Sequence, residues 1–203
     1  MKRVLSAGLL AILLVFGFNA APSSAAGIDV PSGVYNMDPM HAYIAFSYTH
    51  FGFSHPILRF NKFQANLNFN AEDPAKSTLS VMVDPTSIDA GTDTFNEHLQ
   101  SDRFFDTAKF KEITFKATSM KVTGPKTGTI TGNLTIKGVT KPVTLNVTLN
   151  KAGTNPMTKG PALGFSARAT LKRSDWGLGA YAPMVSDDVH LMIEAEFHAK
   201  AAK

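Results

Sequence analysis

The chain has 203 residues, of which 44% are hydrophobic and 18% charged, and it contains no cysteine. This composition is typical of a globular protein, and the absence of cysteine excludes disulfides, thiolate metal sites and a cysteine nucleophile. Removing Lys2 and Arg3, which lie in a predicted leader, from the 20 basic residues leaves 18 against 16 acidic ones. With nearly balanced charge and no basic stripe among aromatic residues, nucleic acid is not an expected partner.

Residues 1–26 predict a cleaved signal peptide. Lys2 and Arg3 precede an apolar run from Leu9 to Phe18, and small residues follow up to Ala26. A run of about ten residues is too short to cross a bilayer, and this three-part order is typical of a secretory leader. An uncleaved anchor is the alternative. We therefore expect an exported, soluble protein, periplasmic or secreted, with one domain over residues 27–203.

Past the leader, hydrophobic residues alternate with polar ones. A period of two predicts strands with one face towards an apolar interior and the other towards water. Turn signals such as Asp73-Pro74 and Gly124-Pro125 separate these strands. The chain is therefore predicted to be all-β, an antiparallel barrel or sandwich of about eight strands. The alternating segments are 44–48, from a start near Ala42, and 63–69, 79–83, 113–117, 130–136, 143–149, 165–171 and 189–197.

The stretch 94–109 breaks the alternation. Residues 96–100 predict a short helical turn capped by Thr94 or Asn96. We expect this turn to lie over one end of the barrel, together with an aromatic cluster made of Phe104, Phe105 and Phe110.

The chain lacks the patterns of common catalytic sites. There is no phosphate-binding loop, and Gly164–Arg168 lacks the second glycine of a nucleophile elbow. No two histidines have the helical spacing of a common zinc site, and a metal site made by folding from His50, His55 and His98 is not expected. We therefore predict no catalytic residue, no metal and no cofactor.

The histidines of the strands differ in their expected environment. His50 shares the parity of Phe46 and Tyr48, so its side chain should face the interior near a strand end. Two interpretations are open: a core imidazole with a backbone partner, or a polar group that meets a ligand head group at the barrel mouth. His190 and His198 have outward parity and are expected to be solvated.

Many phenylalanines have inward parity. Of the 15 in the chain, all but Phe16 and Phe18 lie past the leader. An eight-stranded barrel is near the size at which side chains either fill the interior or leave space for one ligand. Parity does not separate these outcomes, and composition alone slightly favours a packed core. The inward set is Phe46, Phe63, Phe69, Phe115, Phe165 and Phe197.

Five segments occur in an ordered series over residues 33–197. They are Tyr35–Phe46 continuing to His50–Ser54, Arg59–Phe63, Glu97–Asp106 followed by Ile113–Phe115, Gly132–Val143, and Arg173–Gly177. Together they resemble the YceI family of polyisoprenoid-binding, lipocalin-like exported proteins. The chain departs from the family pattern at Ala42, Leu58 and Phe95-Asn96, where Ser, Gly and Arg-Asp are usual.

The resemblance implies one lipocalin-like, antiparallel eight-stranded barrel whose hollow lumen holds a polyisoprenoid, often a quinone-type lipid. We expect a protein that sequesters or transports such a lipid in the periplasm and is not an enzyme. A membrane electron-transfer protein is a candidate donor or acceptor of the lipid, and a homodimer is left open. The expected lumen contacts are Phe46, Tyr48, Phe63, Phe69, Phe115, Phe165 and Trp176, with Phe104 and Phe105 near the mouth and His50 and His98 at the head group.

Three other functions remain open. The barrel could bind a different amphiphile, such as a fatty acid or its amide. Asp102, Asp106 or His98 could act chemically on a bound lipid. A filled interior would instead indicate a structural or adhesive module.

Overall fold

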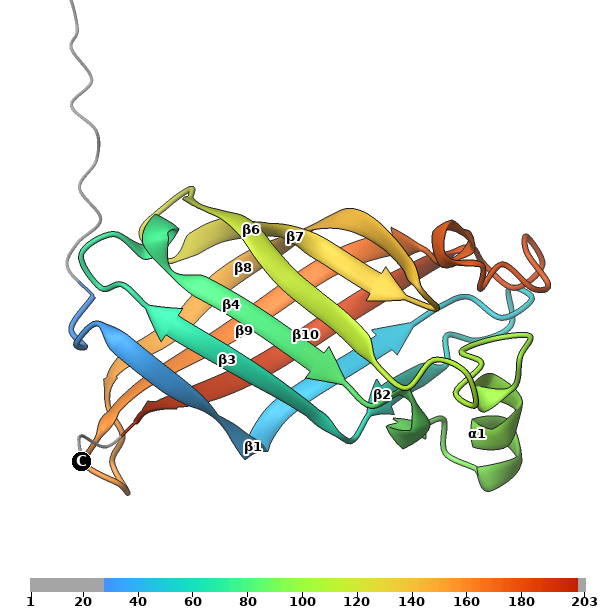
Figure 1. Cartoon of the computed structure of the whole chain (residues 1–203), viewed down its shortest axis with the longest axis horizontal. Helices are drawn as coiled ribbons and strands as arrows, with labels where there is room; N and C mark the ends of the chain where they lie inside the picture. The colour runs from blue at the N-terminus through green and yellow to red at the C-terminus, as the bar shows by residue number, and fades with distance from the viewer. Residues whose placement is uncertain (1–27, 201–203) are drawn as a thin grey trace, which may run out of the picture.

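The computed structural model describes residues 28–200, so the predicted signal peptide lies outside the described residues. The described chain forms an antiparallel barrel with a short helix at one end (Figure 1). Within residues 28–200, no helix is long and apolar enough to cross a membrane. The elements are β1 (Gly33–Ser47), β2 (Ile57–Phe60), β3 (Phe63–Phe69), β4 (Thr78–Val83), β5 (Ile88–Asp89), α1 (Asp93–Gln100), β6 (Ile113–Val122), β7 (Thr127–Ile136), β8 (Val139–Thr154), β9 (Pro161–Lys172) and β10 (Asp188–Ala199), with 3₁₀ turns at Pro74–Lys76, Pro85–Ser87 and Arg173–Trp176.

Eight strands build the barrel wall. Their order is β1, β3, β4, β6, β7, β8, β9 and β10, and pairing of β10 with β1 closes the sheet on itself. The predicted all-β, eight-stranded barrel is confirmed. The short strands β2 and β5 extend the sheet beside the second half of β1. With four and two residues, they are too short for alternation to reveal them.

Strand β1 starts earlier than predicted and is interrupted. It begins at Gly33, not near Ala42, and pairs with β10 up to Met37 and again from Ala42. Four residues of β1, 38–41, therefore lie opposite the single residue Glu196 of β10. Such a bulge bends a strand and redirects its side chains. Because it also shifts the alternation, the first half of the strand could not be recognised by its period.

One outward histidine of β10 is not solvated as predicted. His190 is exposed, but His198 is only 26% exposed and its Nε2 lies 3.3 Å from Asp38 Oδ2. The bulge in β1 brings Asp38 over this ring, a contact that strand parity alone does not reveal.

Helix α1 begins before the expected cap. Thr92, and neither Thr94 nor Asn96, is the N-cap, and its Oγ1 accepts a hydrogen bond from the Phe95 N–H at 3.4 Å. The Asn96 side chain instead accepts the N–H of Ala90 at 2.7 Å. This second bond ties the helix to the end of β5.

The helix lies at one end of the barrel, as predicted (Figure 1). Leu99 is buried there, and Phe104 and Phe105 belong to the same apolar cluster. Phe110 was expected in that group but packs elsewhere, beside Gly138 in the turn between β7 and β8. Only two of the three phenylalanines therefore contribute to this end of the interior.

A glycine makes room for the largest inward ring of β6. A Cβ atom at Gly132 on β7 would lie 2.4 Å from Cζ of Phe115 and 2.6 Å from the carbonyl oxygen of Lys116. The Phe115 ring therefore lies against the bare backbone of the neighbouring strand. This arrangement keeps the ring close to the wall and leaves the axis of the barrel open.

Candidate functional site

The barrel encloses an elongated cavity of about 630 Å³. Its wall includes residues of α1, of the loops around His50 and Tyr181, and of the hairpin between β6 and β7. Figure 1 shows α1 and this hairpin at opposite ends of the barrel. Sites for small molecules usually measure about 300–1,000 Å³. The inward faces of the strands thus enclose space, and the packed interior that composition slightly favoured is wrong.

Every side chain predicted to contact a ligand lies on the wall of this cavity. Parity placed the strand residues there correctly, and the residues after α1 close one end of it. That they contact a ligand stays a prediction. The residues are Phe46, Tyr48, His50, Phe63, Phe69, His98, Phe104, Phe105, Phe115, Phe165 and Trp176.

Aromatic rings form a continuous wall towards the α1 end. The rings of Phe46 and Phe60 lie 5.7 Å apart, and Phe60 meets Phe105 edge-on at 5.6 Å. Trp176 is buried, and its Nε1 donates to the carbonyl oxygen of Leu134 at 3.2 Å. Because this nitrogen is satisfied by the backbone, the indole can offer an apolar surface to the cavity.

Two unpaired imidazoles mark the α1 end. The His50 ring packs edge-on against Phe51 at 4.4 Å, and the exposed His98 ring lies between Phe95 and Phe104. Within residues 28–200, neither ring hydrogen-bonds a protein group. That the His50 ring meets a ligand head group stays a prediction. Both rings are free to meet a polar group of a ligand.

Arg173 is a cavity residue that sequence reasoning did not single out. Its Nε donates to the carbonyl of Ser186 and its Nη2 to that of Val185, both at 2.8 Å, while Nη1 donates to the carbonyl of Leu178. The guanidinium thus organises the loop between β9 and β10 at the mouth. Its position in the segment Arg173–Gly177, three residues before Trp176, was the only signal in the sequence.

The Tyr48 phenol adds a hydrogen-bonding group to the same end. Burial raises the pKa of Tyr48 above its ordinary value, and the nearby charge of Arg173 opposes that rise only in part. The phenol therefore stays protonated at neutral pH and can donate a hydrogen bond. Tyr48, His50, His98 and Arg173 thus give the α1 end several polar wall residues, while Lys121, Lys126 and Thr127 of the β6–β7 hairpin line the other end.

The residues considered for lipid chemistry do not converge. His98 lies on the cavity wall, but Asp102 and Asp106 are not wall residues. His50, His55 and His98 also form no metal-like group. Within residues 28–200, the group with metal-like spacing is Asp38, Glu196 and His198, on the outside of the barrel.

The family model of the YceI-like domain matches residues 35–197. The chain belongs to the YceI family. Curated relatives include a UPF0312 protein of Shewanella sp. (strain MR-7), 34% identical over 111 residues, which are 55% of this chain and 56% of that protein. Another, from Shewanella putrefaciens, is 31% identical over 124 residues, 61% of each chain. The matches therefore span little more than half the length of these YceI-like relatives.

Solved structures share the YceI barrel. The Campylobacter jejuni YceI protein is 28% identical, with a TM-score of 0.69, over 75% of this chain and 90% of that one. Burkholderia cenocepacia BcnA is 22% identical, with a TM-score of 0.72, over 79% and 98%. A polyisoprenoid binding domain from Saccharophagus degradans is 15% identical, with a TM-score of 0.61, over 84% and 100%. At such low identities the last two show likeness of fold alone.

Proposed function

We propose that this YceI-family protein binds a polyisoprenoid lipid in the barrel cavity and carries it through an aqueous compartment. The observation that carries the proposal is the cavity itself, about 630 Å³ of space along the barrel with a mostly apolar wall. The solved polyisoprenoid binding domain with the same fold supports the assignment of the lipid class. In this function the protein binds its ligand without changing it.

Burial of the tail supplies the affinity. Each buried CH₂ contributes about 0.8 kcal/mol, so one five-carbon prenyl unit contributes about 4 kcal/mol. Association costs between about 4 and 15 kcal/mol in lost translational and rotational freedom. Because one prenyl unit barely offsets the lower figure, a tail of several units is favoured over a single unit. Because the cavity is already formed, little of the protein has to become ordered on binding.

The head group meets the α1 end. Tyr48 offers a donor there, and His50 and His98 each offer a ring nitrogen that the protein does not use. A quinone ring, with two carbonyl acceptors, matches these donors. The proposed ligand is therefore a quinone-type lipid whose tail points towards the hairpin between β6 and β7.

An apolar rim surrounds this end. Phe53 is 91% exposed and Met184 62% exposed, and Phe51 and Tyr181 are also exposed. The Phe51 N–H donates to the Met184 carbonyl at 3.0 Å, which joins the two loops into one surface. Such a rim can touch a membrane while the lipid enters or leaves. We place lipid exchange here, in the periplasm, with a membrane electron-transfer protein as candidate donor or acceptor.

Mass spectrometry of an organic extract tests the proposal. Protein purified without detergent should carry about one prenyl lipid per chain, released only on denaturation. A fatty acid or fatty amide in the extract would assign the barrel to another amphiphile. Recovery of chemically altered lipid after incubation would favour an enzyme. An extract without lipid, together with no uptake from quinone-loaded vesicles, would contradict the proposal.

A further inference from the structure

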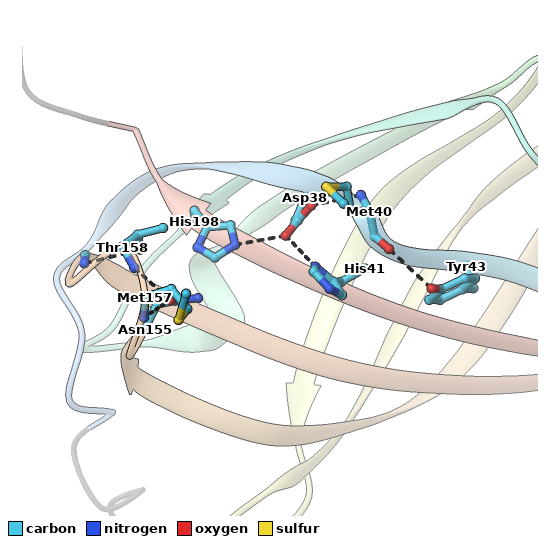
Figure 2. Close-up of polar contacts among 9 residues, drawn as sticks. Asp38, Met40, His41, Tyr43, Asn155, Met157, Thr158 and His198 are labelled. Carbon is cyan, nitrogen blue, oxygen red and sulfur yellow. Dashed lines mark hydrogen bonds and ion pairs between the residues drawn. The ribbon is translucent and has the colours of Figure 1, made fainter.

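A second group of polar side chains lies on the outer face of the barrel, at the bulge in β1. Ala195 and Phe197 of β10 line the cavity, so Glu196 and His198 between and beside them point outward. The bulge carries residues 38–41 across to this same face. Figure 2 shows Asp38 and His41 of β1 pointing towards one another, with His198 of β10 directed at the same carboxylate.

Two imidazoles converge on one carboxylate oxygen. Asp38 Oδ2 lies 2.8 Å from Nδ1 of His41 and 3.3 Å from Nε2 of His198. The ligand atoms of Asp38, Glu196 and His198 all lie within 4.8 Å of one another. The other Asp38 oxygen, Oδ1, accepts the N–H of Met40 at 2.8 Å and holds the carboxylate in place (Figure 2).

These separations suit a transition-metal ion. Zinc is held about 2.0–2.2 Å from nitrogen and oxygen ligands in a tetrahedron, which sets neighbouring ligand atoms about 3.4 Å apart. Within the group, Asp38 Oδ2 and His198 Nε2 are 3.3 Å apart, and no pair of its ligand atoms is more than 4.8 Å apart. Calcium and magnesium prefer oxygen ligands alone, whereas an imidazole beside two carboxylates favours zinc and its neighbours.

The group is accessible to ions from solvent. The side chains of Asp38, His198 and His41 are 19%, 26% and 57% exposed, so an ion can reach them. Nδ1 of His198 is buried without a partner, and Nε2 is the ring nitrogen that faces Asp38, at 3.3 Å from Oδ2.

We propose that Asp38, Glu196 and His198 form a binding site for a divalent transition-metal ion of the zinc type. Asp38 and Glu196 supply negative charge and oxygen ligands, and His198 supplies a nitrogen ligand. His41 positions the Asp38 carboxylate through its own contact with Oδ2. The site joins β1 to β10 from outside and does not depend on the lipid cavity.

Metal titration of protein without a histidine tag tests the site. After treatment with a chelator, ZnCl₂ is added at pH 7.5 and the heat is measured, and CoCl₂ is added in parallel while the visible absorption is recorded. We expect one ion per chain and a cobalt band typical of tetrahedral coordination. His41→Ala and His198→Ala should each weaken binding at least tenfold. The matched control His190→Ala, an exposed histidine of the same strand, should change it less than twofold.

The outcome is decided by stoichiometry and by site dependence. Absence of saturable binding at one equivalent would overturn the proposal, as would binding that survives both His41→Ala and His198→Ala. Loss of the ion in a His50→Ala/His98→Ala variant would place it at the barrel mouth and equally refute the site. Circular dichroism monitors folding of each variant, and Asp38→Asn and the largely exposed His41→Ala keep the test valid if His198→Ala unfolds.

Discussion

A phenylalanine at position 167 would project into the lumen. Ala167 lies on β9 between Val147 of β8 and Ile193 of β10, and it lines the cavity. A cavity of about 150 Å³ holds one benzene molecule. The added ring in Ala167→Phe would therefore occupy about a quarter of the 630 Å³ available.

The expected effect on binding is large and the effect on folding is small. The ring displaces about one five-carbon unit of a lipid tail, which at about 0.8 kcal/mol per CH₂ is about 4 kcal/mol. At 1.4 kcal/mol for each factor of ten, the affinity should fall roughly a thousandfold. In a packed interior the same insertion would cost about 1–3 kcal/mol and lower Tm by about 2–12 °C. In a hollow one Tm should hardly change.

The single tryptophan provides the assay. Trp176 lines the cavity, so a bound quinone should quench its fluorescence, and titration with a short-chain prenyl quinone gives the affinity. Thr170→Phe, on the exposed face of the same strand, is the matched control and should bind normally. If Ala167→Phe loses Tm over the range given above while quenching is unchanged, the interior is filled and the reasoning is refuted.

Three further predictions concern the frame of the site. Gly132→Ala should lower the free energy of unfolding by about 1–3 kcal/mol, because its Cβ would overlap the Phe115 ring; urea melts that match wild type would contradict this. Arg173→Met should lower the free energy of unfolding by at least about 2 kcal/mol, because three loop carbonyls lose their charged donor. Backbone amides of residues 178–186 should then exchange hydrogen faster, and unchanged exchange would argue against the role given to the guanidinium. The Ser174 hydroxyl and N–H hold the pKa of Asp187 below its usual value, so this carboxylate stabilises the fold above pH about 4 and loses that effect as the pH falls through its lowered pKa. Asp187→Asn should flatten the acid limb of the Tm profile, and an identical limb would exclude the contribution.

Most of the barrel wall could be predicted from local sequence because each strand has one face towards solvent and the other towards the apolar interior. The alternation of hydrophobic and polar residues in Phe63–Phe69 and Val143–Leu149 follows from this difference between the two faces. Where a bulge interrupts the alternation, the strand was not predicted. Residues 38–41 leave the ladder at a bulge, so the first half of β1 was missed.

The site was predictable to the extent that it depends on parity. Phe115 and Phe165 could be assigned to the interior from their own strands, whereas the hollow interior was implied only by the family resemblance. The loop contacts of Arg173 and the meeting of Asp38 with His198 depend on tertiary structure. They depend on how segments far apart in the chain are brought together, which no local pattern encodes.

Closure of the barrel determines which strand pairing completes the fold. Tyr35 pairs with Ala199 and Ser47 with His190, so the seam joins the first strand to the last. The lumen is complete only when β10 has paired with β1, and contacts so distant in sequence form slowly. Until then β1 and β9 have unpaired edges and the inner face of the sheet is apolar and exposed, and both features promote aggregation. A lipid that binds only the closed barrel would shift the folding equilibrium towards it. The supply of lipid would therefore govern how much of the newly made chain reaches the folded state.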